Sequence, residues 1–313
     1  MAWQIELLTL AIHYDALYHE AWFERGTIYL LVDELYLAYR DMTEAIRLAP
    51  EPSEEYRKMR DELFSTKDFQ RSAFEARDAL WQGVRERANS MGLSDGIYLA
   101  RSHYLRGQAS MDLVQCEAAA DDFSADVARD PYHANGYVYR GRALYCLGQY
   151  EKALADFSKG INAFSHWAWE RAAGAAHVWK GRALRMLKRY AEADENFSKA
   201  ISIEREMNTV PSMNVLCNAF YGRALVKKDL NRYELVIEDL TIAVELAPEW
   251  PHPQSTIRRD GPDYAGIPPT RGNVYRVMAD AFHQMDDRER EHRAWQMACR
   301  FYDAEACEKV LAK

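Results

Sequence analysis

One phrase recurs along the chain, and this repetition restricts the possible folds more than any other feature. RGRALYCLGQYEKALADF runs from Arg140 to Phe157, and a close variant, KGRALRMLKRYAEADENF, runs from Lys180 to Phe197. A third variant, YGRALVKKDLNRYELVIEDL, runs from Tyr221 to Leu240. When the copies are aligned on their glycines, the repeating unit is about 34 residues long, a period typical of stacked helix pairs.

Each unit predicts two helices that pack closely against each other. A glycine lies in the first helix and a large apolar residue in the second, as with Gly141 and Phe157. Glycine inside a helix costs about 1 kcal/mol relative to alanine, so its recurrence needs a compensating interaction. We expect Phe157 to lie against the bare backbone at Gly141, which brings the two helices to the short end of the ~8–10 Å packing range.

The pattern resembles the tetratricopeptide repeat family. The small first-helix position is held by Gly26, Gly107, Gly141, Gly181, Gly222 and Ala279. The large second-helix position is held by Met42, Phe123, Phe157, Phe197, Leu240 and Trp295. The resemblance implies an all-α fold, a right-handed α-α superhelix of about six to seven helix pairs, because only the next pair can cover the apolar face of the last. Asp126 departs from the pattern, since it occupies an alanine position.

We expect a single solenoid over residues 1–313. Its parts are a half repeat (1–18), repeats at 19–52, 100–133, 134–167, 174–207 and 215–250, a degenerate repeat plus helix (53–99), a proline-rich loop (251–271) and a closing repeat (272–313). Insertions around Trp167 and Pro211 are expected to lengthen the helices that follow them. The half repeat leaves one helix face uncovered, which is explained by a partner, a second copy, a longer parent protein or a simple capping role.

The middle of the chain carries a predicted binding surface. Residues three apart share a helix face, and in this family the inner faces of first helices line a concave surface. Three successive repeats place an aromatic residue and an arginine in this way. The predicted peptide-binding residues are Tyr104, Tyr139, Arg142, Trp179, Arg182, Arg185, Phe220, Arg223 and Lys227. Guanidinium groups grip carboxylates and aromatic rings bury large areas, so we expect an acidic peptide or protein partner. The alternative is that these side chains serve solubility or packing between repeats.

A second arginine series predicts ion pairs with a structural role. Arg25, Arg106 and Arg140 directly precede a repeat glycine, and an aspartate follows each of them sixteen residues later. These aspartates are Asp41, Asp122 and Asp156, and at the same interval Lys180 faces Asn196. We expect each pair to join the two helices of its repeat.

Net charge, hydrophobicity and cysteine content restrict the possible partners and the cellular compartment. The net charge of −8 argues against nucleic acid as a partner, although residues 134–210 hold twelve Lys or Arg against eight Asp or Glu. The sequence shows no export signal and no apolar stretch of membrane-spanning length, which predicts a cytoplasmic protein without a membrane partner. The cysteines are therefore expected to be reduced. The spacing of Cys299 and Cys307 resembles that of Sel1-like repeats, and this resemblance implies a disulfide there instead.

Catalytic patterns are absent from the sequence. It has no H-E-x-x-H, no nucleophile elbow and no phosphate-binding glycine loop, so we expect no enzyme activity, no metal and no cofactor. The favoured function is a non-catalytic module that binds a peptide or protein segment. The first alternative is a scaffold or oligomerisation subunit that acts through its ends and the loop at 251–271, with a homo-oligomer formed through the N-terminal open face. A further alternative is an enzyme, or the regulatory subunit of an enzyme whose chemistry lies in another chain.

Overall fold

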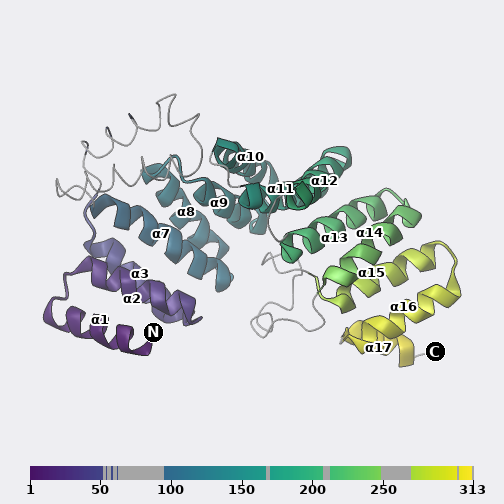
Figure 1. Ribbon diagram of the computed structural model, residues 1–313, viewed down its shortest axis with the longest axis horizontal. Coiled ribbons are helices and arrows are strands. Elements are labelled where there is room, and N and C mark those ends of the chain that lie inside the picture. The colour runs from purple at the N-terminus through teal and green to yellow at the C-terminus, as the bar shows by residue number, and fades with distance from the viewer. Residues whose placement is uncertain are drawn as a thin grey trace. The chain divides into compact units, whose positions relative to one another are not determined.

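The computed structural model describes residues 1–51, 54, 58, 62, 95–166, 170–206, 212–247, 269–301 and 303–311. Within these ranges fourteen helices alternate with short turns, and there is no strand (Figure 1). Most of the expected degenerate repeat (53–99) and of the proline-rich loop (251–271) lies outside the described residues. The chain divides into two compact units, Met1–Trp169 and Glu170–Lys313, which are described separately.

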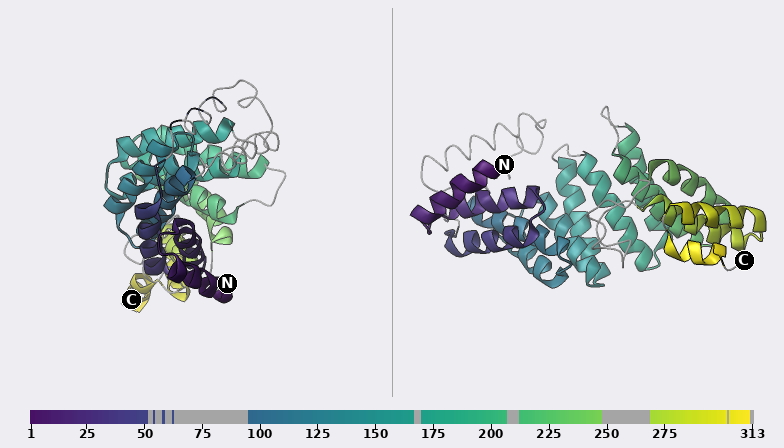
Figure 2. Two further views of the ribbon diagram at one scale, coloured as in Figure 1. Left: turned by 90° about the vertical axis from the view of Figure 1, so that its left-hand side faces the viewer. Right: turned by 90° about the horizontal axis from the view of Figure 1, so that it is seen from below.

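The first unit is a row of helices in which neighbours along the chain pack side by side (Figures 1 and 2). Its helices are α1 (Ala2–Tyr14), α2 (His19–Leu31), α3 (Leu35–Leu48), α7 (Asp95–Asp112), α8 (Cys116–Arg129), α9 (Ala134–Cys146) and α10 (Tyr150–His166). The pairs α2/α3, α7/α8 and α9/α10 form hairpins, while α3 with α7 and α8 with α9 join successive pairs. Helix α1 packs on α2 at the end of the row.

The second unit repeats this arrangement. Its helices are α11 (Glu170–Met186), α12 (Tyr190–Glu206), α13 (Met213–Asp229), α14 (Tyr233–Leu246), α15 (Arg271–Gln284), α16 (Arg288–Arg300) and α17 (Ala304–Leu311). Helices α11 and α13 have 17 residues each, against 13 in α9, as the two insertions predicted. Nowhere in the described part of the chain is a helix both long and apolar enough to cross a bilayer.

The turns inside the helix pairs share one geometry. Each contains a residue with positive φ, and the set comprises Asp33, Val114, Gly148, Lys188, Asn231 and Asp286. The next amide N–H bonds back to the carbonyl five residues earlier, as from Gln149 to Leu144 and from Arg189 to Leu184. This bond pattern is the Schellman type of helix end, which satisfies carbonyl groups that the helix leaves unpaired. It lets the second helix turn back directly against the first.

Packing inside each pair confirms the predicted contact between glycine and a large side chain. A Cβ atom at Gly141 would lie only 2.6 Å from Phe157 Cε1, and the Phe157 side chain is fully buried. The equivalent distances are 2.8 Å at Gly107 and 2.9 Å at Gly181. Carbon atoms normally approach no closer than about 3.5 Å. These positions therefore require glycine, and the close helix approach that results compensates for its low helix propensity.

The predicted ion pairs are also confirmed. Arg25 and Arg140 each lie 2.6 Å from the aspartate sixteen residues later, and so does Arg106. In the fourth case Asn196 has a different neighbour, because its Oδ1 lies 2.9 Å from His177 Nδ1. The aspartates are almost fully buried, so each pair joins its two helices within the interior of the repeat.

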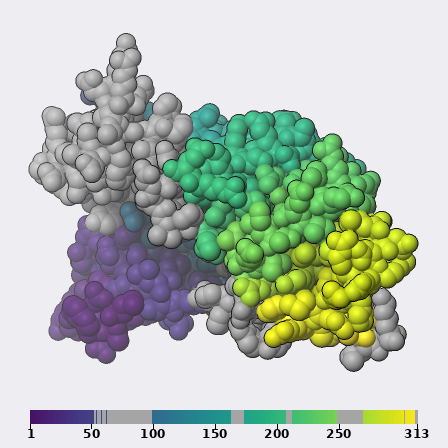
Figure 3. Space-filling view, turned by 45° about the vertical axis from the view of Figure 1, so that its right-hand side comes forward, coloured from purple at the N-terminus to yellow at the C-terminus, as the bar shows by residue number. Residues whose placement is uncertain are grey.

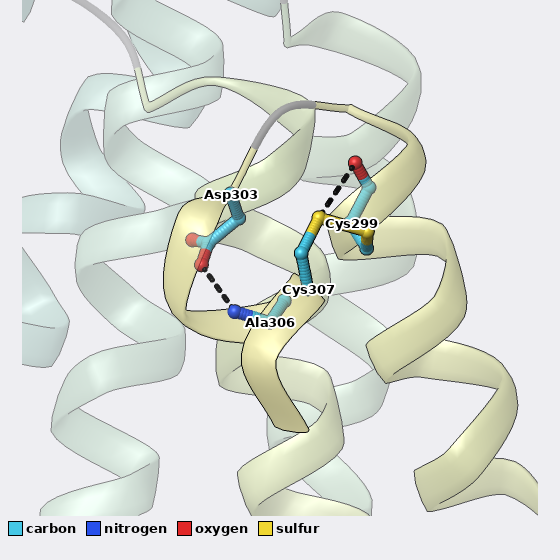
Figure 4. Close-up of a disulfide and its surroundings, with 4 residues drawn as sticks. All are labelled: Cys299, Asp303, Ala306 and Cys307. Carbon is cyan, nitrogen blue, oxygen red and sulfur yellow. Dashed lines mark hydrogen bonds between the residues drawn. A yellow bond between two sulfur atoms is a disulfide. The ribbon is translucent and has the colours of Figure 1, made fainter. Parts of the chain in front are cut away.

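The expectation of reduced cysteines is wrong for four of the five thiols. Cys116 at the start of α8 is joined to Cys146 at the end of α9, with Cα atoms 6.2 Å apart. Cys299 and Cys307 are joined as well, with Cα atoms 4.6 Å apart (Figure 4). This second bond is the one that the Sel1-like spacing implied. Cys217 is a buried free thiol, and burial raises its pKa to about 12.

Candidate peptide-binding surfaces

In the first unit, an aromatic cluster joins two successive repeats. Tyr104 on α7 and Tyr139 on α9 meet edge to face, with ring centroids 5.5 Å apart. Tyr104 also contacts Phe123 and receives a hydrogen bond of 3.2 Å from Gln108. The Arg142 guanidinium lies 4.5 Å from the centre of the Tyr139 ring, which agrees with the predicted shared face. Three of the predicted site residues, Tyr104, Tyr139 and Arg142, are therefore brought together here.

A buried aspartate hydrogen-bonded to a half-buried histidine supports this cluster, and the histidine was not identified from the sequence. Asp126 is 1% exposed and its Oδ2 lies 2.7 Å from His133 Nδ1, while the His133 ring lies 4.6 Å from that of Tyr104. Burial raises the pKa of Asp126. Burial opposes the charged form of His133, but the hydrogen bond to Asp126 and the negative charges of Asp126 and Asp130 together outweigh it and raise the pKa of the ring. The signal in the sequence was the aspartate in an alanine position, with Gly136 leaving room for its carboxylate.

In the second unit, the pair Trp179 and Arg182 belongs to the packing between α11 and α13. The guanidinium lies 4.5 Å from the Trp179 ring centre, and its Nη2 donates to Asn218 Oδ1 at 2.6 Å. Trp179 is 6% exposed and Arg182 is 8% exposed. The predicted shared face is therefore present, but the longer α13 covers most of it.

Arg223 takes the structural place that Arg140 holds in the first unit. Its guanidinium grips Asp239 with hydrogen bonds of 3.0 and 2.7 Å, and its Nη1 donates to Ser198 at 3.0 Å. Asp239 again lies sixteen residues after the arginine. In this repeat Tyr221, not an arginine, precedes the glycine, and two extra residues lie near Lys228, so the arginine after the glycine reaches the aspartate.

Asp239 carries a second cation. Lys227 Nζ lies 2.7 Å from Asp239 Oδ2, so one carboxylate is shared by two positive side chains. A third cation, Arg205, lies beside this pair. Its guanidinium and that of Arg223 are both 5.4 Å from the centre of the Phe220 ring. Phe220 itself is only 2% exposed, whereas Arg205 is exposed. We call Arg205, Phe220, Arg223, Lys227 and Asp239 the basic cluster of the second unit.

The nine predicted residues thus fall into separate sets. Tyr104, Tyr139 and Arg142 lie in the first unit, and the other six lie in the second. Of these six, Phe220, Arg223 and Lys227 are in the basic cluster, Trp179 and Arg182 pack against α13, and Arg185 bonds Asp229 at 2.7 Å. Among the described residues, no group of three or more histidine, cysteine or acidic side chains is arranged to hold a metal ion.

Comparison with known proteins agrees with this architecture. Residues 175–207 match the family model of the tetratricopeptide repeat. No curated protein matches the sequence. Among solved structures, pilF of Pseudomonas aeruginosa superposes with a TM-score of 0.57 at 12% identity, covering 94% of this chain and 96% of that one. The C-terminal part of a repeat-containing protein from Cytophaga hutchinsonii gives 0.51 at 14% identity, covering 97% and 92%.

These likenesses confirm the expected fold class. The chain has the all-α fold of a tetratricopeptide-repeat solenoid, and residues 175–207 are one repeat of that family. A solenoid of this kind implies protein–protein interaction, and proteins of the family are generally non-catalytic.

Proposed function

We propose that this chain is a non-catalytic interaction module that binds an acidic segment of a partner protein, with the basic cluster of the second unit as its main carboxylate-binding site. The observation that carries the proposal is the sharing of Asp239 by Arg223 and Lys227. One carboxylate neutralises one cation, so the cluster keeps a positive surplus that an acidic ligand can meet.

Arg223 in this cluster also has N–H donors beyond those used in its contacts with Asp239 and Ser198. A guanidinium has five N–H donors, and the contacts to Asp239 and Ser198 occupy three of those on Arg223. The side chains of Arg223 and Lys227 are 21% and 15% exposed, so a ligand carboxylate can approach while bulk water is partly excluded. Partial exclusion of water strengthens a charge-assisted hydrogen bond relative to one at a fully exposed site.

The remaining predicted residues have two roles in this proposal. Tyr104, Tyr139 and Arg142 are half-buried and provide a separate contact surface in the first unit, suited to an apolar or acidic side chain. Trp179 and Phe220 are buried, so their role is to hold the guanidiniums of Arg182 and Arg223 over their rings rather than to touch the ligand. Arg185 is paired with Asp229, so it adds no positive surplus to the site.

The test is selection of binding peptides from a random display library on the purified chain, followed by affinity measurements. We expect selected peptides to be rich in Asp and Glu and to bind more weakly as salt is added. Replacing Arg205 and Lys227 together by alanine should weaken binding at least about tenfold, equal to about 1.4 kcal/mol.

The matched control is Lys199→Ala. Lys199 lies on α12 in the same unit and pairs with Glu195 on an exposed face, so its loss removes one positive charge outside the cluster, against two inside it in the double variant. Peptides without acidic enrichment, or equal losses of affinity in the control and in the double variant, would refute the proposed site.

A scaffold role through the ends of the array is the second candidate, and one observation favours it: the exposed apolar face of α1, discussed below. The proline-rich loop that the same candidate invoked lies almost wholly outside the described residues.

A further inference from the structure

Helix α1 is apolar on two opposite faces. Ile5, Leu8 and Ile12 lie on one side at helical spacing, and of these Ile12 is buried against the neighbouring helix. At about 100° per residue, Trp3, Leu7, Leu10 and Tyr14 form a stripe on the other side. These four side chains are 62%, 54%, 49% and 82% exposed. Figure 3 shows the dark purple N-terminal residues at the edge of the first unit, open toward the viewer.

This open stripe is unusual for a helix at the edge of a stack of repeats. Terminal helices of solenoids normally carry a polar outer face, because no further repeat covers them. Helix α17 follows this rule, since it exposes Glu305, Glu308 and Lys309. A helix that is apolar on both sides is normally buried on both sides. The outer face of α1 therefore has the character of an interface.

We propose that this face binds the same face of a second copy of the chain, with the two α1 helices antiparallel about a twofold axis. Successive members of the stripe are four, three and four residues apart, which is the seam spacing of a coiled coil. In the antiparallel arrangement Leu7 of one copy faces Leu10 of the other, and Trp3 faces Tyr14. Aliphatic residues thus meet aliphatic residues and aromatic rings meet aromatic rings, so the stripe is complementary to itself.

The charges beside the stripe fit the same arrangement. Glu6 and His13 each directly precede a stripe residue, so they lie on one flank of the seam. An antiparallel partner brings Glu6 of each copy toward His13 of the other, which gives two favourable contacts. In a parallel pair this flank would face the opposite flank of the partner, so Glu6 would lie opposite Ala11 and the contact with His13 would be lost. The flank therefore selects one orientation of a second copy.

The exposed area is consistent with a weak dimer. Met1 and Leu17, which are 60% and 70% exposed, extend the apolar surface at the two ends of the stripe. With about 200 Å² for an aromatic side chain and about 100 Å² for an aliphatic one, the surface comes to roughly 500 Å² per copy. The total of about 1,000 Å² is the lower limit for a specific interface. A dimer of this size forms in a concentration-dependent way.

The experiment is sedimentation velocity of the whole chain from roughly 1 μM to 1 mM, alongside two variants. Leu10→Glu puts a carboxylate into the seam twice, and we expect it to raise the dimer dissociation constant by at least about 30-fold. Leu235→Glu is the control, since Leu235 is an exposed leucine on α14 in the other unit. It should leave the dimer unchanged.

Three outcomes overturn the proposal: a monomer at every concentration, a dimer that survives Leu10→Glu, or equal losses in both variants. Leu10 is half exposed, so both variants should keep the helical circular dichroism spectrum of the parent, which separates loss of the interface from loss of the fold. The orientation has its own readout. A mixture of Leu7→Cys and Leu10→Cys chains should cross-link as the mixed pair, and preferential cross-linking of identical chains would rule out the antiparallel seam.

Discussion

Phe197 lies between two glycines. Helix propensity alone predicts that alanine in place of Gly222 stabilises the chain, but this arrangement predicts the opposite. A Cβ atom placed on Gly222 of α13 would lie 2.5 Å from Phe197 Cζ. A Cβ atom on Gly181 of α11 would lie 2.9 Å from the same atom. The ring is fully buried, so it cannot move away from one helix without striking the other. Gly222→Ala therefore overpacks the junction between two successive helix pairs.

The expected change in the free energy of unfolding is the difference between two opposing contributions. An added methyl group in a tight core costs about 1–3 kcal/mol, while alanine gains about 1 kcal/mol over glycine in helix propensity. We expect Gly222→Ala to lower the free energy of unfolding by up to about 2 kcal/mol. Phe197→Ala alone should cost about 3–5 kcal/mol, but it removes the ring that the new methyl group meets. In that background Gly222→Ala should stabilise by up to about 1 kcal/mol.

The assay is reversible urea denaturation of the parent, the two single variants and the double variant, followed by far-ultraviolet circular dichroism. The four free energies of unfolding form a double-mutant cycle, and the expected coupling energy is about 1–3 kcal/mol. Additive effects, or a stabilising Gly222→Ala in the parent chain, would show that the close approach at Phe197 is not what requires glycine.

Three further predictions follow from the same interior. Asp156→Ala leaves a largely buried arginine without its carboxylate and should cost about 2–4 kcal/mol in denaturant unfolding, whereas Glu195→Ala on an exposed face should leave the midpoint unchanged within error. Burial lowers the pKa of His177, so the unfolded chain binds the proton more readily and acidification below about pH 6.5 should reduce stability; a nuclear magnetic resonance titration of the ring with a midpoint at or above the ordinary value would contradict this. Intact mass should show the chain two hydrogens lighter for each disulfide, and replacing both Cys116 and Cys146 by serine should cost up to about 3–4 kcal/mol, so an equal thermal midpoint would refute a stabilising bond there.

Much of the fold could be predicted because the repeat fixes distances along the chain. Two helices joined by a turn of constant geometry place a residue of the first beside a residue sixteen positions later, which is why Arg140 and Asp156 were found from their interval alone. The contact of Gly141 with Phe157 follows from the same register. In both cases the partners lie within one repeat, so local sequence carries the information.

Contacts between repeats were harder to predict. Trp179 and Arg182 share a face as expected, but both are buried where α11 packs on α13 and Arg182 bonds Asn218, a contact that depends on how one repeat packs on the next. The bond between Cys116 and Cys146 spans 30 residues and depends on how α8 packs on α9. It also depends on the redox state of the compartment, and disulfides are typical of oxidising ones.

Charge reversal at the basic cluster tests the central claim most directly. Arg205 is exposed, so Arg205→Glu changes the charge of the cluster while leaving the ion pairs on Asp239 in place. We predict that this variant loses at least about tenfold in affinity for a selected acidic peptide and regains it when the contacting acid of the peptide is replaced by lysine. Equal affinity of the parent and variant chains for both peptides would contradict electrostatic recognition of an acidic partner at this site.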